Sequence, residues 1–425
     1  MNHRRSIWKA VLVSALVVGG GHLAGQVPES PAVGHARQIV QLLKEEKFDE
    51  VAKQFNAQVA AAMSAVQLRQ VWSTFTQQVG GFTAFLDQRV TTPAPNITAV
   101  VLGSQFEKAA IDIFVAFDAE QKIAGLRFAP RQPPAEPPSP PPSSSRFKEE
   151  PVTVGEGEWA LPGTLSIPTG KVTGAVVLVH GSGPQDRDTT IGPNKALRDI
   201  AWGLADRGIA VLRYDKRSRV HGPKMAGNKN LTVREETIDD ALLAVKLLRS
   251  RSEIDPKRVF VLGHSLGGML APRIGAEDPS LAGLIILAGT TRPLVDVMRE
   301  QLTYIASLSP PGGMNPDDSL QMLMKSAPES YWKDLEGYKP AEVAAKLKMP
   351  MLILQGERDY QVTMADLQGW RDALGSRTDV TIKSYPTLNH LFMAGEGKAT
   401  PAEYERPGHV ADFVLDDIAA WIGKH

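Results

Sequence analysis

One short stretch constrains the fold of this chain more than any other, because it places a serine between two glycines after an apolar run. Residues 259–262 are apolar and β-rich, which predicts a buried strand. Residues 263–267 read Gly-His-Ser-Leu-Gly, a match to the pattern G-x-S-x-G, and a helical pattern follows. Glycines beside the serine remove Cβ atoms that would clash in a tight strand-to-helix turn. Such a turn raises the Ser265 hydroxyl out of the sheet and places the Leu266 N–H at a helix N-terminus, where it can stabilise an oxyanion.

The chain from residue 151 onward alternates strand-like and helical stretches. Further strands are expected at residues 175–179, 209–213, 284–288, 351–355 and 380–385, and helices at residues 195–207, 237–250 and 411–422. This alternation predicts a mostly parallel sheet with helices on both faces, so residues 151–425 are expected to form an α/β domain. Residues 152–167 predict an opening strand pair that turns at Leu-Pro-Gly, residues 161–163. Pro272 predicts a kink or a shortened helix after Ser265.

An acid and a histidine follow two of these strands. Asp359 comes after a strand and a tight turn, and His390 after a strand and a loop. Open α/β sheets place their sites at the carboxyl ends of strands, so both side chains are expected near Ser265. Serine needs a base to become a nucleophile, histidine titrates in the right range, and a carboxylate fixes the histidine tautomer. The chain order Ser265, Asp359, His390 is typical of α/β-hydrolases.

Other residues compete for these roles. Glu357 is an alternative acid, although its position nearer the strand places it in the turn. His409 is an alternative base, but it precedes the terminal helix. His264 and His180 are expected to pack beneath the site, and His221 to be solvated in a basic loop.

A second glycine-containing loop follows an early strand. Residues 180–183 read His-Gly-Ser-Gly, and the two glycines allow the backbone to approach an acyl oxygen closely. We therefore assign the Ser182 N–H to an oxyanion hole together with that of Leu266.

These motifs identify a resemblance. Residues 151–425 resemble α/β-hydrolase-fold serine esterases, and most of all bacterial esterases in which His-Gly-Ser-Gly-Pro precedes Asp-Arg-Asp, here residues 186–188. That group often continues its next strand as Tyr-Asp-Lys-Arg-Gly, whereas here residues 214–217 are followed by Ser218. The resemblance implies hydrolysis of a small-molecule ester with neither a cofactor nor a metal.

The resemblance also implies a cap at residues 291–348, a long connection with helical pieces and a Pro-Pro-Gly-Gly break. Several of its side chains line an acyl pocket or form the core of the cap: Tyr304, Met314, Met322, Met324, Tyr331 and Trp332. The sequence gives no sign of a long, uninterrupted apolar groove, so we expect substrates with short acyl chains.

Residues 32–130 are expected to form a separate small domain. Helical spacing up to residue 79 gives way to four strand-like stretches, which predicts an α+β fold. The pattern is similar to the nuclear-transport-factor-two-like superfamily and carries no catalytic set. Residues 131–150 are rich in proline and serine and read as a linker.

The first residues and the composition indicate location and exclude some partners. Residues 1–25 place three basic residues before a short apolar run and a small-residue stretch, the layout of a signal peptide. An exported protein is expected, periplasmic or secreted, with no stable membrane span after processing; an uncleaved anchor is the alternative. The formal net charge is zero, which argues against a nucleic-acid surface, and the absence of cysteine excludes disulfides and thiolate metal sites.

The sequence thus predicts an exported serine esterase. Two other functions remain open: a serine peptidase of the prolyl-oligopeptidase type, and a binding protein that keeps the hydrolase fold without catalysis.

Overall fold

The computed structural model of the chain describes residues 31–94, 97–131, 146–225, 227–308 and 315–425. They fall into two compact units that divide between residues 138 and 139. The predicted signal peptide, residues 1–25, lies outside the described residues, and so does most of the predicted linker, residues 132–145.

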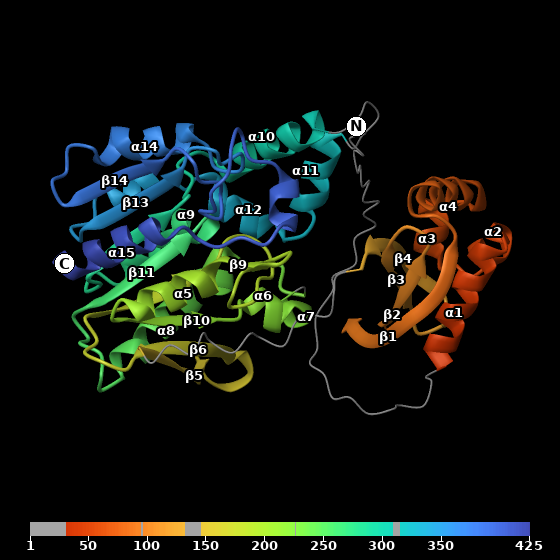
Figure 1. Cartoon of the computed structure of the whole chain (residues 1–425), viewed down its shortest axis with the longest axis horizontal. Helices are drawn as coiled ribbons and strands as arrows, with labels where there is room; N and C mark the ends of the chain where they lie inside the picture. Colours follow the sequence, from red (N-terminus) through yellow and green to blue (C-terminus); the bar gives the residue numbers. More distant parts are fainter. Residues whose placement is uncertain (1–30, 95–96, 132–145, 226, 309–314) are drawn as a thin grey trace. The chain divides into compact units, whose positions relative to one another are not determined.

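The first unit is an α+β unit, as its sequence pattern predicts. Its helices are α1 (Pro31–Lys44), α2 (Phe48–Ala52), α3 (Ala57–Ala62) and α4 (Ala65–Val79), and its strands are β1 (Phe82–Ala94), β2 (Ile97–Phe106), β3 (Ala110–Phe117) and β4 (Ile123–Pro130). The strands form an antiparallel sheet in the order β1-β2-β3-β4 (Figure 1). Alternate residues of β3, such as Ile111 and Ile113, are fully buried in the core that the sheet shares with the helices.

The second unit is built on an eight-stranded sheet in the order β14-β13-β12-β11-β7-β10-β6-β5. Its strands are β5 (Phe147–Val154), β6 (Leu161–Pro168), β7 (Gly174–Val179), β10 (Ile209–Tyr214), β11 (Val259–His264), β12 (Gly283–Leu287), β13 (Met351–Gly356) and β14 (Val380–Tyr385). β6 runs antiparallel to both of its neighbours, β10 and β5, and the other neighbouring strands of this sheet pair in parallel. The predicted mostly parallel sheet is therefore confirmed.

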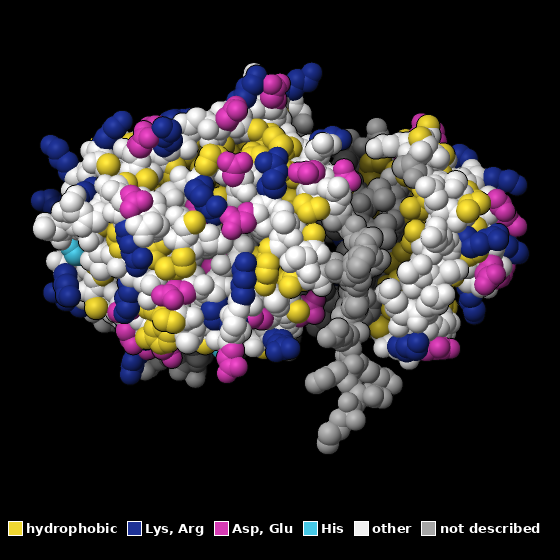
Figure 2. All heavy atoms as spheres, turned by 90° about the horizontal axis from the view of Figure 1, so that it is seen from above, with side chains coloured by type: hydrophobic (Ala, Val, Ile, Leu, Met, Phe, Trp, Pro, Cys, Tyr) yellow, Lys and Arg dark blue, Asp and Glu magenta, His cyan; other side chains and the backbone are white. Residues whose placement is uncertain are grey.

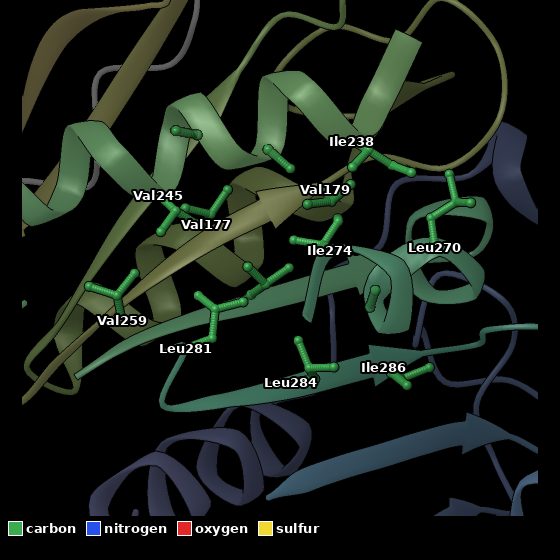
Figure 3. Close-up of a cluster of buried hydrophobic side chains, with 14 of the residues drawn as sticks. Val177, Val179, Ile238, Val245, Val259, Leu270, Ile274, Leu281, Leu284 and Ile286 are labelled. Carbon is green, nitrogen blue, oxygen red and sulfur yellow. The ribbon is translucent and has the colours of Figure 1, made fainter. Parts of the chain in front are cut away.

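Helices cover both faces of this sheet because its central strands are apolar on both sides. They are α5 (Ala196–Asp206), α8 (Asp239–Arg249), α9 (Leu266–Glu277), α14 (Met364–Leu374) and α15 (Asp412–Lys424). Val177 and Val179 of β7 belong to the core with α8 and α9, where Figure 3 shows Val177 near Val245 and Val179 near Ile274. Val176 and Leu178, which alternate with them, belong to the core with α5 and α15.

Local departures from the expected pattern have physical causes. The residues Leu-Pro-Gly at 161–163 lie inside β6, and the chain reverses before them through a 3₁₀ turn, Gly157–Trp159. Gly155 and Gly157 have φ values of 76° and 65°, which suit glycine, so the reversal occurs there. Of the two outcomes predicted at Pro272, a kink or a shortened helix, the shortened helix is wrong, since α9 continues to Glu277. Its neighbours are almost all buried, and their packing outweighs one missing helix hydrogen bond.

The long connection between β12 and β13 contains α10 (Leu294–Ser307), α11 (Pro316–Met324), α12 (Glu329–Glu336) and α13 (Pro340–Ala344), named here the cap helices. Of these, α10, α11 and α12 gather at one end of the second unit (Figure 1). The hydroxyl of Tyr338 donates to the Met269 carbonyl across 2.8 Å, and Arg273 pairs with Asp334 at 2.9 Å, so α9 anchors this group.

On the face of the second unit seen in Figure 2, Lys and Arg side chains are interspersed with Asp and Glu rather than gathered by sign. Within the described ranges, no helix is long and apolar enough to span a membrane.

Candidate active site

Ser265 occupies a strained turn between β11 and α9. Its backbone has φ 56° and ψ −117°, a conformation that is costly for any residue with a Cβ. Its N–H donates to the Leu287 carbonyl across 2.9 Å, which fixes the turn to β12. A Cβ on Gly263 would lie 2.1 Å from the Gly267 carbonyl oxygen, and a Cβ on Gly267 would lie 2.4 Å from that of Val179. Only glycine therefore fits on either side of the serine.

Asp359 follows β13 in a turn that orients its carboxylate. The residue is 4% exposed, and its Oδ1 accepts the backbone N–H groups of Gln361 and Val362 at 2.7 and 3.1 Å. Its Oδ2 accepts from Gln355 Nε2 at 3.2 Å. This oxygen also lies 2.6 Å from His390 Nδ1, so the acid and the histidine are joined directly.

His390 is buried in the loop after β14, and a second histidine supports its backbone. His264 Nε2 donates to the His390 carbonyl oxygen across 2.9 Å, and the two rings are 4.7 Å apart. Burial, together with the charge that His390 can carry, lowers the pKa of His264 to about 3. His264 is thus a neutral donor next to Ser265 in the chain, and it connects the turn to the histidine loop.

The loop after β7 lies beside the serine. A Cβ on Gly181 would be 3.2 Å from the Ser265 Cβ, so the loop backbone approaches the turn closely. Ser182 is exposed, and Leu266 is the first residue of α9, where a helix N–H has no acceptor within the helix. His180 is buried at the base of this loop, and burial, with a smaller effect from the Lys216 charge, lowers its pKa to about 4.

The competing residues are engaged elsewhere. Glu357 is exposed and accepts from the Ser384 hydroxyl at 2.7 Å. His409 lies 3.1 Å from an Asp199 oxygen on the protein surface. His221, expected to be solvated, is half-buried: its Nε2 lies 3.1 Å from the Ala160 carbonyl oxygen and its ring packs on Trp159. The loop that carries it folds into two short helices, α6 (Arg217–Val220) and α7 (Gly222–Met225), which explains this burial.

Two supporting residues escaped the sequence analysis. Gln355 has the last side chain of β13 before the turn, and its amide donates a hydrogen bond to the Asp359 carboxylate. Lys216 is buried, and its Nζ lies 2.9 Å from the Gly181 carbonyl oxygen. The only sequence signal for Lys216 was its place in a motif that follows a strand.

The aromatic residues of the cap helices are mostly structural. Tyr331 is buried and its hydroxyl donates to Glu236, whereas the Trp332 indole donates to the Met324 carbonyl at 2.7 Å. Tyr304 packs on Tyr360, the neighbour of Asp359, at 5.2 Å between ring centroids. Met314 lies outside the described residues.

In the parts of the chain that the structure describes, no group of three or more His, Cys, Asp or Glu side chains could hold a metal ion. The polar groups described at the candidate site are a serine, a histidine joined to a carboxylate, and backbone amides.

Comparisons with known proteins identify the family of the chain. The prolyl oligopeptidase family model matches residues 199–416, just over half of the chain, and a family of unknown function, DUF3887, matches residues 36–126. Esterase EstD of Thermotoga maritima is 40% identical over 401 residues, which cover 91% of this chain and 94% of that protein.

More distant similarities cover only part of the chain. A monoacylglycerol lipase of Mycolicibacterium smegmatis is 25% identical over 279 residues, 59% of this chain and 89% of its own. A solved esterase of Pyrococcus furiosus has 18% identity and a TM-score of 0.44, covering 65% of this chain and 92% of its own. On the strength of the EstD and prolyl oligopeptidase matches, the chain belongs to the prolyl oligopeptidase family and to the α/β-hydrolase serine esterases that include Esterase EstD.

Proposed function

We propose that the chain hydrolyses carboxylic esters through an acyl-enzyme on Ser265. The observation that carries this proposal is the 2.6 Å hydrogen bond between Asp359 and His390, both in loops at the carboxyl ends of strands, in a chain 40% identical to an esterase. The Ser265 hydroxyl attacks the acyl carbon while His390 accepts its proton. Asp359 holds the imidazole in the tautomer whose Nε2 is free to act as the base and stabilises the imidazolium that forms.

In the same proposal, the N–H groups of Ser182 and Leu266 bind the oxyanion of the tetrahedral intermediate. The alcohol then leaves with the proton from His390, and water repeats the sequence on the acyl-enzyme. The closeness of Gly181 to the Ser265 Cβ supports this assignment, since the next peptide N–H belongs to Ser182.

Short acyl chains are the proposed substrates. Two of the aromatic residues that could have lined a long acyl groove have structural contacts: the Tyr331 hydroxyl donates to Glu236 before α8, and the Trp332 indole donates to Met324 of α11. The test is a series of p-nitrophenyl esters from acetate to palmitate with wild type and Ser265→Ala. Turnover of the short esters that disappears in the variant is expected, and equal activity in both proteins would exclude Ser265 as the nucleophile.

Peptide hydrolysis is the second candidate, because the family model that matches residues 199–416 is that of prolyl oligopeptidases. The described residues ahead of the second unit form α1–α4 and a four-stranded meander, and no β-propeller is found among them. Ester and anilide substrates with the same acyl group separate the two activities. Faster cleavage of the anilide would reverse the preference proposed here.

We also propose that the protein is exported. The support is sequence alone: Arg4, Arg5 and Lys9 precede a short apolar run and a small-residue stretch within residues 1–26. N-terminal sequencing of the protein from a periplasmic or culture fraction is the direct test. A mature N-terminus near residue 25 is expected, whereas an intact Met1 on membrane-bound protein would indicate an anchor.

A further inference from the structure

Lys216 is a buried cation that the reaction described above does not use. The residue is 1% exposed, and its Nζ donates to the Gly181 carbonyl oxygen across 2.9 Å. β7 and β10 are parallel neighbours, and Gly181 and Lys216 each follow the end of their strand by two residues. The sheet itself therefore brings the lysine to the loop beside Ser265.

The carbonyl that Lys216 holds belongs to the same peptide group as the Ser182 N–H. Because a trans peptide is planar, its oxygen and its hydrogen point in opposite directions, so fixing the oxygen also fixes the N–H. A hydrogen bond from a charged donor is roughly twice as strong as a neutral one. A positive charge on the carbonyl also polarises the amide and makes its N–H a better donor.

We infer that Lys216 is a positioning residue for the oxyanion hole: it aims and polarises the Ser182 N–H toward the acyl oxygen of an ester bound at Ser265. This inference rests on the proposed role of Ser265. Lys216 itself touches neither substrate nor nucleophile, and it acts through the Gly181–Ser182 peptide.

Two further residues hold the lysine in place. Glu236 Oε1 lies 3.3 Å from the Lys216 Nζ, and Glu236 Oε2 accepts the Tyr331 hydroxyl at 2.9 Å. Glu236 lies in a π-helical turn, Arg234–Ile238, immediately before α8, and such turns often occur at functional sites. Tyr331 belongs to α12, so the chain of contacts runs from a cap helix through Glu236 and Lys216 to the oxyanion loop.

Stability alone is a weak reason for this arrangement. A buried ion pair usually contributes little more than apolar residues of the same volume, because both charges lose their hydration. The Lys216 backbone N–H already bonds to the Gln185 carbonyl of the same loop at 3.1 Å, so the loop is attached without the side chain. What the hydrogen bond from the Lys216 Nζ contributes in addition is a fixed orientation of the Gly181–Ser182 peptide group.

The test compares Lys216→Met with Lys224→Met, which removes an exposed lysine from the adjacent helix α7. Active sites are first counted by complete titration with an organophosphonate, so that kcat refers to functional enzyme. Loss of a whole oxyanion-hole donor costs about 10²–10³ in kcat, so misorienting one is expected to cost about 10- to 100-fold. KM should change little, because the interaction forms in the transition state.

A second readout separates positioning from general damage to the fold. A boronic acid forms an anionic tetrahedral adduct with the serine, and its affinity should fall by the same factor as kcat/KM in Lys216→Met. Lys224→Met should retain both values. If Lys216→Met does not fold, the same measurements are made on the double variant Lys216→Met with Glu236→Gln. This variant leaves no buried charge unpaired, so its kcat and boronate affinity test the inference.

The possible failures are distinguishable. Wild-type activity that survives in Ser265→Ala would overturn the proposed function and this inference with it. Activity that depends on Ser265, with kcat per titrated site and boronate affinity unchanged in the lysine variant, would overturn the inference alone.

Discussion

The Nε2 of His264 lies 2.9 Å from the backbone carbonyl oxygen of His390, so the residue before the proposed nucleophile supports the residue that we propose as its base. A carbonyl oxygen only accepts, which makes Nε2 the protonated nitrogen of His264. The turn that carries Ser265 and the loop that carries His390 are therefore joined by a hydrogen bond from the buried His264 imidazole.

The burial of His264 predicts a pH dependence of stability, because a buried imidazole resists protonation. The pKa of His264 is about 3 in the folded protein and about 6.5 when the chain is unfolded, so between these values only the unfolded chain binds the proton. The contribution of His264 to the free energy of unfolding is therefore complete above pH 6.5 and decreases as the pH falls toward 3. At pH 5 this group alone lowers the free energy of unfolding by about 2 kcal/mol. Urea unfolding of wild type and His264→Gln at pH 7 and 5 should show a smaller loss in the variant. Parallel losses in the two proteins would contradict the prediction.

Asp359→Asn should inactivate the enzyme without unfolding it. The backbone N–H groups of Gln361 and Val362 hold the Asn oxygen where Oδ1 now lies, which turns the amide NH2 toward His390 Nδ1. The imidazole must then carry its proton on Nε2, where it cannot accept one from Ser265. We expect kcat to fall by about 10³- to 10⁴-fold, as for other triads that lose this carboxylate. Glu357→Gln is the matched control and should change kcat little; a large loss there would favour Glu357 as the acid.

The sequence predicted the parts of this site that depend on local geometry. The turn around Ser265, the acid after β13 and the histidine after β14 are each coded within a few consecutive residues, and parallel strands bring their carboxyl ends together. The parallel direction of most strands followed from the alternation of strands and helices.

The contacts that support the site could not be predicted in the same way. Lys216, Glu236 and Tyr331 meet across three elements that are distant in the sequence, and nothing near any of them signals the other two. His221 was misjudged for the same reason, because its partner Ala160 lies 61 residues away. Long-range packing decides such positions, whereas local pattern decides the turns.

Gly267→Ala should destabilise the protein and reduce its activity. The added Cβ would lie 2.4 and 2.6 Å from the carbonyl oxygens of Val179 and His180, and backbone atoms cannot move away as a flexible side chain can. We expect a cost of about 1–3 kcal/mol in the free energy of unfolding, the usual range for overpacking. Gly170→Ala is the control, since a Cβ there meets nothing within 4 Å. Thermal unfolding and ester turnover of both variants check this, and equal stability of the two would contradict it.

Arg213→Met should destabilise the second unit more than the loss of a surface ion pair. Arg213 is 3% exposed, and its guanidinium bonds to Glu149 of β5 at 2.7 Å and to Asp188 at 2.9 Å. Its removal leaves the partly buried Glu149 without its cation, whereas Asp188 keeps only Lys195 at 3.8 Å, and breaking such a buried pair costs about 3 kcal/mol or more. Glu149 lies within the range predicted for the linker, yet β5 begins at Phe147 and is paired along its length with β6.

The control for Arg213→Met is Lys148→Met on the same strand, where the lysine side chain is 62% exposed and pairs with Glu150 at 2.7 Å. A solvent-exposed pair of this kind contributes between about 0 and 1 kcal/mol. Denaturant unfolding of both variants should therefore separate them by about 2 kcal/mol or more. Equal midpoints would mean that the first strand is attached to the sheet by its backbone pairing alone, and that the buried arginine contributes nothing to holding β5 in place.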